Sequence, residues 1–295
     1  MSIINNAHAG SSVLMLRLID TYLISIKPKT ASKQKIEEIC KPENLPKTDN
    51  ARKKFLSNLN FWIEQGLWFE KDGEIYISDE FATELNLSAR VLKICIDNCR
   101  DNDVTDKNNT TIEPFLRCVA CLLAQDKFAF GGQTINSGQG GIDLAINDYL
   151  PQYLAINKTN EGGVLRDYSR FLGFIEPIEK DAFILDPTRA ILTALPYVFS
   201  SSDVLGINTF IDNLANVLPV LDRGTFRTQV EKLMLDKGWE PPSPNEVSAS
   251  LSHALERLEV AEVITMSQRS DDEKQMSLKT LNNRSVGTIT LRKKH

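Results

Sequence analysis

The chain has 295 residues, of which 42% are hydrophobic and 25% are charged. This composition leaves room for two or three domains with cores of their own and excludes a largely disordered chain. The formal net charge of −5 excludes a protein that coats nucleic acid over its whole surface, so any contact with DNA is confined to a local patch.

The sequence carries no signal for export or membrane insertion. No run approaches the roughly 18 apolar residues that a membrane-spanning helix needs, and the first residues lack the basic-then-apolar layout of a signal peptide. The cysteines are odd in number, which favours free thiols in a reducing compartment: Cys40, Cys95, Cys99, Cys118 and Cys121. We therefore expect a cytoplasmic protein without membrane contact.

Three helices are predicted at the start of the chain. Apolar residues follow helical spacing over residues 11–25. A shorter helix is expected from Ser32, as its cap, to Cys40. After a turn with two prolines, a third helix follows residues 48–50, with Phe55, Leu59, Trp62 and Ile63 on one side.

A β-hairpin is predicted directly after these helices. Gly66 ends the third helix, as glycine often does. Asp72 and Gly73 then separate two short β-prone runs, which is a strong local hairpin signal. Three helices followed by a hairpin is the order of a winged helix-turn-helix.

A similar tail occurs in the middle of the chain. Residues 164–173 read as a helix that ends in glycine, and residues 174–185 as a hairpin that turns near Lys180 and Asp181. The earlier helices of this copy are expected at 111–126 and 142–153, with a glycine-rich loop between them.

A third copy is predicted at the end of the chain. Ser243-Pro-Asn-Glu246 has the residues of a helix start, and three leucines follow at helical spacing. Residues 263–266 and 276–280 are expected to flank a charged hairpin tip at 267–274, and residues 285–291 could add a strand. The lead-in helices are expected at 203–218 and 224–237.

Repetition makes this interpretation stronger than any single element. The predicted fold class is mainly α with short β-hairpins (α+β), in three tandem winged helix-turn-helix modules. Their expected bounds are residues 1–100, 101–198 and 199–295.

Basic residues are concentrated in the first module. Residues 27–54 hold nine basic and four acidic residues, about five net positive charges, which leaves the remaining chain about ten net negative. Such a patch gives affinity for the DNA backbone, and the amides of Asn58 and Asn60 could pair with base edges. The candidate contacts to duplex DNA are Lys33, Lys35, Lys47, Arg52, Lys53, Lys54, Asn58 and Lys71.

A protein-interaction scaffold remains the alternative. Lysines at these spacings also occur on helix faces that only contact solvent. Acidic chains with tandem winged helices resemble the small subunits that dock onto kleisin-type proteins without direct DNA contact. Trp62, Trp68 and Phe69 discriminate between the two: exposed together they form a partner-binding patch, and buried they only hold the wing.

No catalytic or metal-binding motif is evident. The paired cysteines Cys95/Cys99 and Cys118/Cys121 lie in apolar helical stretches without knuckle turns, which favours buried small hydrophobes over zinc ligands. Residues 131–141 are glycine-rich but no Gly-Lys-Ser/Thr follows. We expect no metal, no cofactor and no enzymatic activity, although convergent carboxylates leave an enzyme open as a third interpretation.

The opening residues resemble a known family. Met1-Ser-Ile-Ile-Asn5 and Ala9-Gly-Ser-Ser-Val-Leu-Met-Leu-Arg-Leu18 are similar to the start of the DpdG family, which is encoded in bacterial clusters that insert 7-deazaguanine derivatives into DNA and restrict DNA lacking them. The resemblance implies an accessory subunit of a multi-protein restriction assembly in bacterial defence. It implies no catalytic residues. The expected partners are duplex DNA, through the first module, and other subunits of the assembly.

Overall fold

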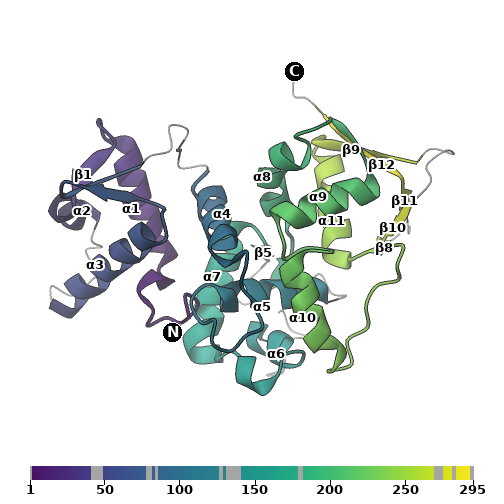
Figure 1. The fold of residues 1–295 in the computed structure, drawn as a ribbon, viewed down its shortest axis with the longest axis horizontal. Helices are drawn as coiled ribbons and strands as arrows, with labels where there is room; N and C mark the ends of the chain where they lie inside the picture. The colour runs from purple at the N-terminus through teal and green to yellow at the C-terminus, as the bar shows by residue number, and fades with distance from the viewer. Residues whose placement is uncertain are drawn as a thin grey trace.

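The computed structural model describes residues 2–40, 49–77, 82–83, 86–125, 129–130, 141–178, 182–268, 275–280 and 284–292 (Figure 1). Within these ranges the protein is rich in helices and has four small three-stranded sheets. Lys47, residues 131–140 and the predicted turns at 180–181 and 269–274 lie outside the described residues. No helix in the described ranges has both the length and the apolar character that crossing a bilayer requires.

The first segment, residues 13–76, follows the predicted order with one added strand. Its elements are α1 (Val13–Ser25), β1 (Thr30–Ser32), α2 (Lys33–Cys40), α3 (Asp49–Glu64), β2 (Phe69–Lys71) and β3 (Glu74–Tyr76). The Ser32 hydroxyl accepts a hydrogen bond from the Lys35 amide at 3.2 Å, which confirms the predicted cap of α2. Asp72 and Gly73 have φ angles of +54° and +82°, as a tight hairpin turn between β2 and β3 requires. The three-residue strand β1 was not predicted.

The second segment, residues 113–185, follows a connecting helix, α4 (Leu87–Cys99). A short 3-10 helix, η1 (Ala9–Ser11), precedes the first segment and contacts α3. The elements of the second segment are α5 (Glu113–Ala124), β4 (Ala129–Phe130), α6 (Ile142–Asn147), η3 (Gln152–Leu154), η4 (Lys158–Gly162), α7 (Gly163–Leu172), β5 (Ile175–Pro177) and β6 (Phe183–Leu185). The predicted helix at 142–153 is therefore shorter than expected, and the predicted hairpin of 174–185 is present as the pair β5–β6.

The third segment, residues 188–291, departs furthest from the prediction. Its elements are α8 (Thr188–Val198), β7 (Val204–Gly206), α9 (Ile207–Val217), α10 (Thr225–Leu235), β8 (Glu246–Val247), α11 (Ala249–Val260), β9 (Ile264–Ser267), β10 (Met276–Leu278), β11 (Ser285–Val286) and β12 (Thr288–Leu291). Residues 188–198 lie within the expected bounds of the second module, but the helix α8 that they form was not predicted and contacts α9 and α11 of this segment. Helix α10 packs against α5.

Two local predictions for the third segment were wrong. Ser243 does not cap a helix: the chain there forms a turn and then β8, and α11 is capped by Ser248, whose hydroxyl accepts from the Leu251 amide at 3.4 Å. Strands β9 and β10 do not pair with each other. β9 pairs with β12, and β10 pairs with β8 and β11 in a separate sheet.

The three segments repeat one sheet topology. Each has a helix, a strand, at least two further helices and then two strands that end its sheet. The sheet orders are β1-β3-β2, β4-β6-β5 and β7-β12-β9, and all neighbours in these sheets are antiparallel. The last strand therefore lies between the other two in every segment.

The segments are joined by buried contacts. Asp20 of α1 is completely buried and accepts hydrogen bonds from the indole of Trp68 at 3.0 Å and from Arg90 of α4 at 3.1 Å. The Tyr168 hydroxyl of α7 donates to the Gly10 carbonyl, and the Ser250 hydroxyl of α11 donates to the Leu123 carbonyl of α5 at 2.9 Å. The connecting helix α4 thus lies between the first segment and the rest of the molecule (Figure 1).

Candidate nucleic-acid interface

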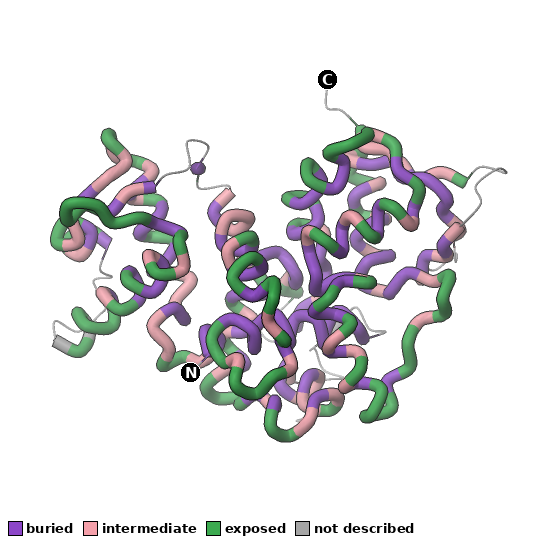
Figure 2. Tube along the Cα trace, in the orientation of Figure 1, coloured by how far each residue is buried: buried purple, intermediate pink, exposed green. Residues whose placement is uncertain are grey.

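Helix α3 has one buried and one exposed face. Phe55, Leu59 and Trp62 are fully buried against the rest of the first segment. The opposite face exposes Lys53, Ser57 and Asn60 at the i, i+4, i+7 spacing that aligns side chains along a helix. The helix lies at the outer edge of the molecule, so this face is turned to solvent (Figures 1 and 2).

Three of the basic residues predicted to contact DNA form ion pairs with carboxylates of the protein itself. Lys33 forms an ion pair of 2.8 Å with Glu70 of the hairpin, and Lys35 lies 3.5 Å from Glu38 on its own helix. The Nε atom of Arg52 in α3 donates to both carboxylate oxygens of Glu37 in α2, at 2.9 and 3.0 Å. These pairs reduce the positive charge that α2 and the start of α3 present to a phosphate.

Lys53 and Lys54 remain the basic residues best placed for a backbone contact. Both are exposed on the first half of α3. The Nζ atom of Lys54 lies 3.5 Å from the carbonyl oxygen of Asn6, which is a weak neutral contact that a phosphate can replace.

The hairpin is less favourable for phosphate than expected. Lys71 is exposed on β2, but Glu70, Asp72 and Glu74 surround it on the same hairpin. Carboxylates so close to one lysine repel a phosphate. A contact between Lys71 and DNA therefore stays a prediction, and it has less support than contacts through Lys53 and Lys54.

The prediction that Asn58 reads base edges is wrong for this fold. Its side chain is fully buried, and its amide nitrogen donates to the carbonyl oxygen of Ala9 at 2.7 Å. Residues two apart on a helix do not share a face, so Asn58 points into the core while Asn60 points to solvent.

The two asparagines give a matched prediction. Asn58→Ala should destabilise the fold by about 1–3 kcal/mol, because the partly buried hydrogen bond to the Ala9 carbonyl is lost and the core loses the volume of the side chain. Asn60→Ala should leave the free energy of unfolding unchanged within about 0.5 kcal/mol. Urea unfolding of both variants measures the difference, and equal losses would contradict the assignment of the two faces.

The aromatic patch that would indicate a partner-binding surface does not form at the hairpin. Trp62 and Trp68 are fully buried, and Phe69, which is 40% exposed, stacks on Tyr76 with ring centroids 5.8 Å apart. Trp68 therefore holds the hairpin against α1 through Asp20, and Phe69 pairs with Tyr76 across the two strands of the hairpin.

The corresponding helices of the other two segments are largely covered. In α11 only Arg257 and Val260 are exposed, because the helix packs against α8 and the sheet. Helix α7 packs against α1 and α4 and keeps a narrow exposed stripe in which Asp167 and Arg170 have opposite charges. Among these three helices, α3 alone combines a broad exposed face with an excess of basic side chains.

The cysteines are buried thiols in this structure. Cys95 and Cys99 lie in α4 and Cys118 and Cys121 in α5, and all five cysteines are buried and free. Burial raises the pKa of Cys95 and of Cys118 to about 12. No group of His, Cys, Asp or Glu side chains suited to a metal ion occurs in the described part of the chain.

We expect these thiols to react slowly in the folded protein. The thiolate is the reactive form, and a pKa raised from about 8.5 in an unfolded chain to about 12 leaves very little thiolate at pH 8. Labelling with a thiol-specific reagent should be slow in buffer and complete for all five residues in urea. Rapid labelling of Cys95 or Cys118 under native conditions would contradict their burial.

The topology and the exposed face of α3 describe an α-rich protein of three repeated segments, the first of which has a solvent-facing helix with exposed lysines. Its residues 1–272 match the model of the DpdG-like family, so the chain belongs to that family. This membership suggests involvement in a Dpd-type DNA-modification cluster. No curated protein and no solved structure matched the chain.

Proposed function

We propose that this protein is a non-catalytic DNA-binding adaptor of three tandem winged-helix modules, which acts in a bacterial DNA-modification and restriction assembly. It binds duplex DNA through the first module and other subunits through the rest of its surface. Membership of the DpdG-like family supports a role in a DNA-modification assembly. The fold and the exposed lysines of the first segment support the proposed binding of duplex DNA through that segment.

The repeated topology supports the winged-helix assignment. The first segment has the element order of a winged helix. A helix, a strand and two further helices are followed by a two-stranded wing, and the last strand lies in the centre of the sheet. The second segment has the same order with η3 and η4 added, and the third inserts α10 and the strands β8, β10 and β11. In such modules the third helix enters the major groove and its surroundings contact phosphates.

The exposed face of α3 is the single observation that carries the DNA-binding proposal. Lys53 and Lys54 are positioned to contact phosphates, while Ser57 and Asn60 are neutral hydrogen-bonding groups further along the same helix. This combination supplies sequence-independent affinity with little base discrimination.

A protein-interaction scaffold of the tandem winged-helix type, with no DNA contact, is the second candidate. It is favoured by the carboxylates Glu37 and Glu70, which hold two of the basic residues, and by the acidic hairpin. In that case α3 is a solvated helix face and the modules bind only other subunits.

Titration of a fluorescent duplex with the purified full chain, repeated at several salt concentrations, tests the proposal. We expect micromolar affinity at about 0.1 M salt and a linear fall of log K with log salt concentration, because each phosphate contact releases counterions. Absence of binding at low salt, with a folded protein, would overturn DNA binding and leave the scaffold.

A further inference from the structure

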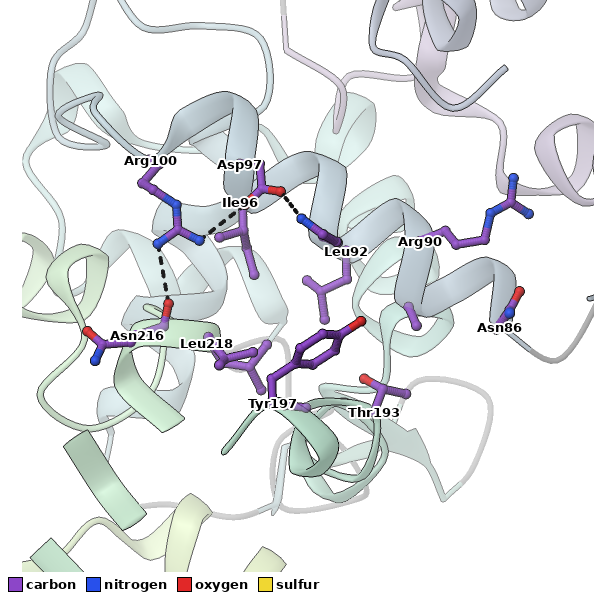
Figure 3. Close-up of a pocket in the computed structure, with 14 residues that line it drawn as sticks. Asn86, Arg90, Leu92, Ile96, Asp97, Arg100, Thr193, Tyr197, Asn216 and Leu218 are labelled. Atoms are coloured by element: carbon purple, nitrogen blue, oxygen red, sulfur yellow. Dashed lines mark hydrogen bonds and ion pairs between the residues drawn. The ribbon is translucent and has the colours of Figure 1, made fainter. Parts of the chain in front are cut away.

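A cleft lies between α4 and the third segment, away from the face of α3. It has a volume of about 600 Å³, which is the size of sites that enclose a ligand or the anchoring side chains of a partner. One wall is α4, and the other is formed by α8 and the end of α9 (Figure 3).

The lower part of the cleft is apolar. Leu92 and Ile96 of α4 and Leu218 opposite them are nearly buried at its floor, and the ring of Tyr197 lies over them (Figure 3). Tyr197 is 62% exposed although it is a large aromatic residue. The apolar surface continues along α8 through Leu192, which is 46% exposed, and the exposed Pro196. A surface that extends beyond the cleft in this way suits a partner segment better than a small ligand.

The rim of the cleft on α4 is basic. Lys93 and Arg100 are both more than half exposed and share a single carboxylate, that of Asp97. One negative charge between two positive ones leaves a net positive rim above the apolar wall. Arg100 also donates to the Asn216 carbonyl of α9 at 3.4 Å, which joins the two walls at one end.

We infer that this cleft binds an amphipathic helix of a partner subunit, with apolar side chains on one face and acidic residues flanking them. The apolar anchors pack on the exposed Tyr197 and Leu192 of α8, and the acidic residues lie against Lys93 and Arg100. The inference rests on the proposed adaptor function, since an adaptor needs a protein-docking surface separate from its DNA-binding helix.

Selection from a random 16-residue peptide library on the full chain tests this inference, with counter-selection on the variant Tyr197→Ala. We expect enriched peptides with apolar residues at i, i+3 or i+4 and i+7 and an excess of Asp and Glu. Tyr197→Ala should weaken their binding ~10-fold or more. Lys93→Glu should weaken it by about fivefold or more, and by less at high salt.

The chain offers a matched control for the aromatic residue. Tyr153 has the same exposed fraction, 62%, as Tyr197 and does not line the cleft, so Tyr153→Ala should leave peptide binding unchanged. Tyr197→Ala should also leave duplex DNA affinity unchanged, which separates failure of this inference from failure of the DNA-binding proposal.

Two results would overturn the inference. The first is a selection that yields no peptides able to distinguish the wild type from Tyr197→Ala, or only peptides without acidic excess. The second is a loss of duplex DNA affinity in Tyr197→Ala while the selection yields no peptide, which would assign the cleft to nucleic acid.

Discussion

Replacing Lys53 and Lys54 together with glutamate should lower the affinity for duplex DNA by at least about tenfold at 0.1 M salt. Both side chains are exposed on α3, the helix that the proposed function places against DNA. Because each lost phosphate contact lowers the salt dependence by nearly one unit, the slope of log K against log salt concentration should fall by about two. Fluorescence anisotropy titrations at four salt concentrations measure both quantities.

The control for this variant has to change the net charge equally without touching α3. Lys107 and Lys237 are exposed lysines outside the first segment, and their double replacement with glutamate changes the total charge by the same amount. We expect that control to lose much less affinity and to keep the slope of the wild type. Equal losses in the two variants would show that only the overall charge matters and would remove α3 as the interface.

The first segment was predictable because its signals are local. The cap at Ser32 acts over three residues, and the turn at Asp72 and Gly73 needs only a backbone conformation that these two residues adopt readily. Even the burial of Asn58 was available from the sequence. It lies three residues after Phe55 and four before Trp62, on the apolar face of the helix, so helical periodicity alone indicates that it is buried.

The third segment was predicted less well because its strand pairing is not local. Residues 264–267 and 276–278 look like the two arms of one hairpin, yet the first pairs with β12 and the second with β8 and β11. The choice between these partners depends on burial of each strand against helices elsewhere in the segment. Nothing within a window of ten or twenty residues contains that information.

The charge of the candidate interface was overestimated for the same reason. Counting residues 27–54 gives a strongly basic patch, but Glu70, which holds Lys33, is far along the chain in the hairpin. The cleft beside α4 also could not be predicted from the sequence, since its lining combines residues near positions 90–100 with residues near positions 193–218. Only the fold brings these groups together.

The contact between the first segment and α4 gives the largest expected effect on stability. The carboxylate of Asp20 has no exposed surface and lies 3.1 Å from the guanidinium of Arg90, whose side chain is only 12% exposed. The same carboxylate accepts the indole hydrogen bond of Trp68. Removing the Asp20 carboxylate takes this counter-charge from the nearly buried guanidinium of Arg90 and this acceptor from the buried indole N–H of Trp68.

Asp20→Ala should therefore lower the free energy of unfolding by about 3–5 kcal/mol, the usual cost of breaking a buried ion pair from one side. Asp20→Asn should cost less, because the amide oxygen can still accept from Trp68. Urea unfolding followed by tryptophan fluorescence measures both variants. Because α4 provides Arg90 and the first segment provides Asp20 and Trp68, the loss should also loosen the attachment of the first segment to the rest of the molecule.

An exposed ion pair provides the comparison. Asp212 lies 3.0 Å from Arg223, but the two side chains are 60% and 37% exposed, so Asp212→Ala should cost no more than about 1 kcal/mol. A loss for Asp20→Ala as small as that for Asp212→Ala would mean that Arg90 and Trp68 reach water or other partners once Asp20 is gone. The first segment would then be held to α4 by apolar packing, and this ion pair would have no part in orienting the proposed DNA-binding helix.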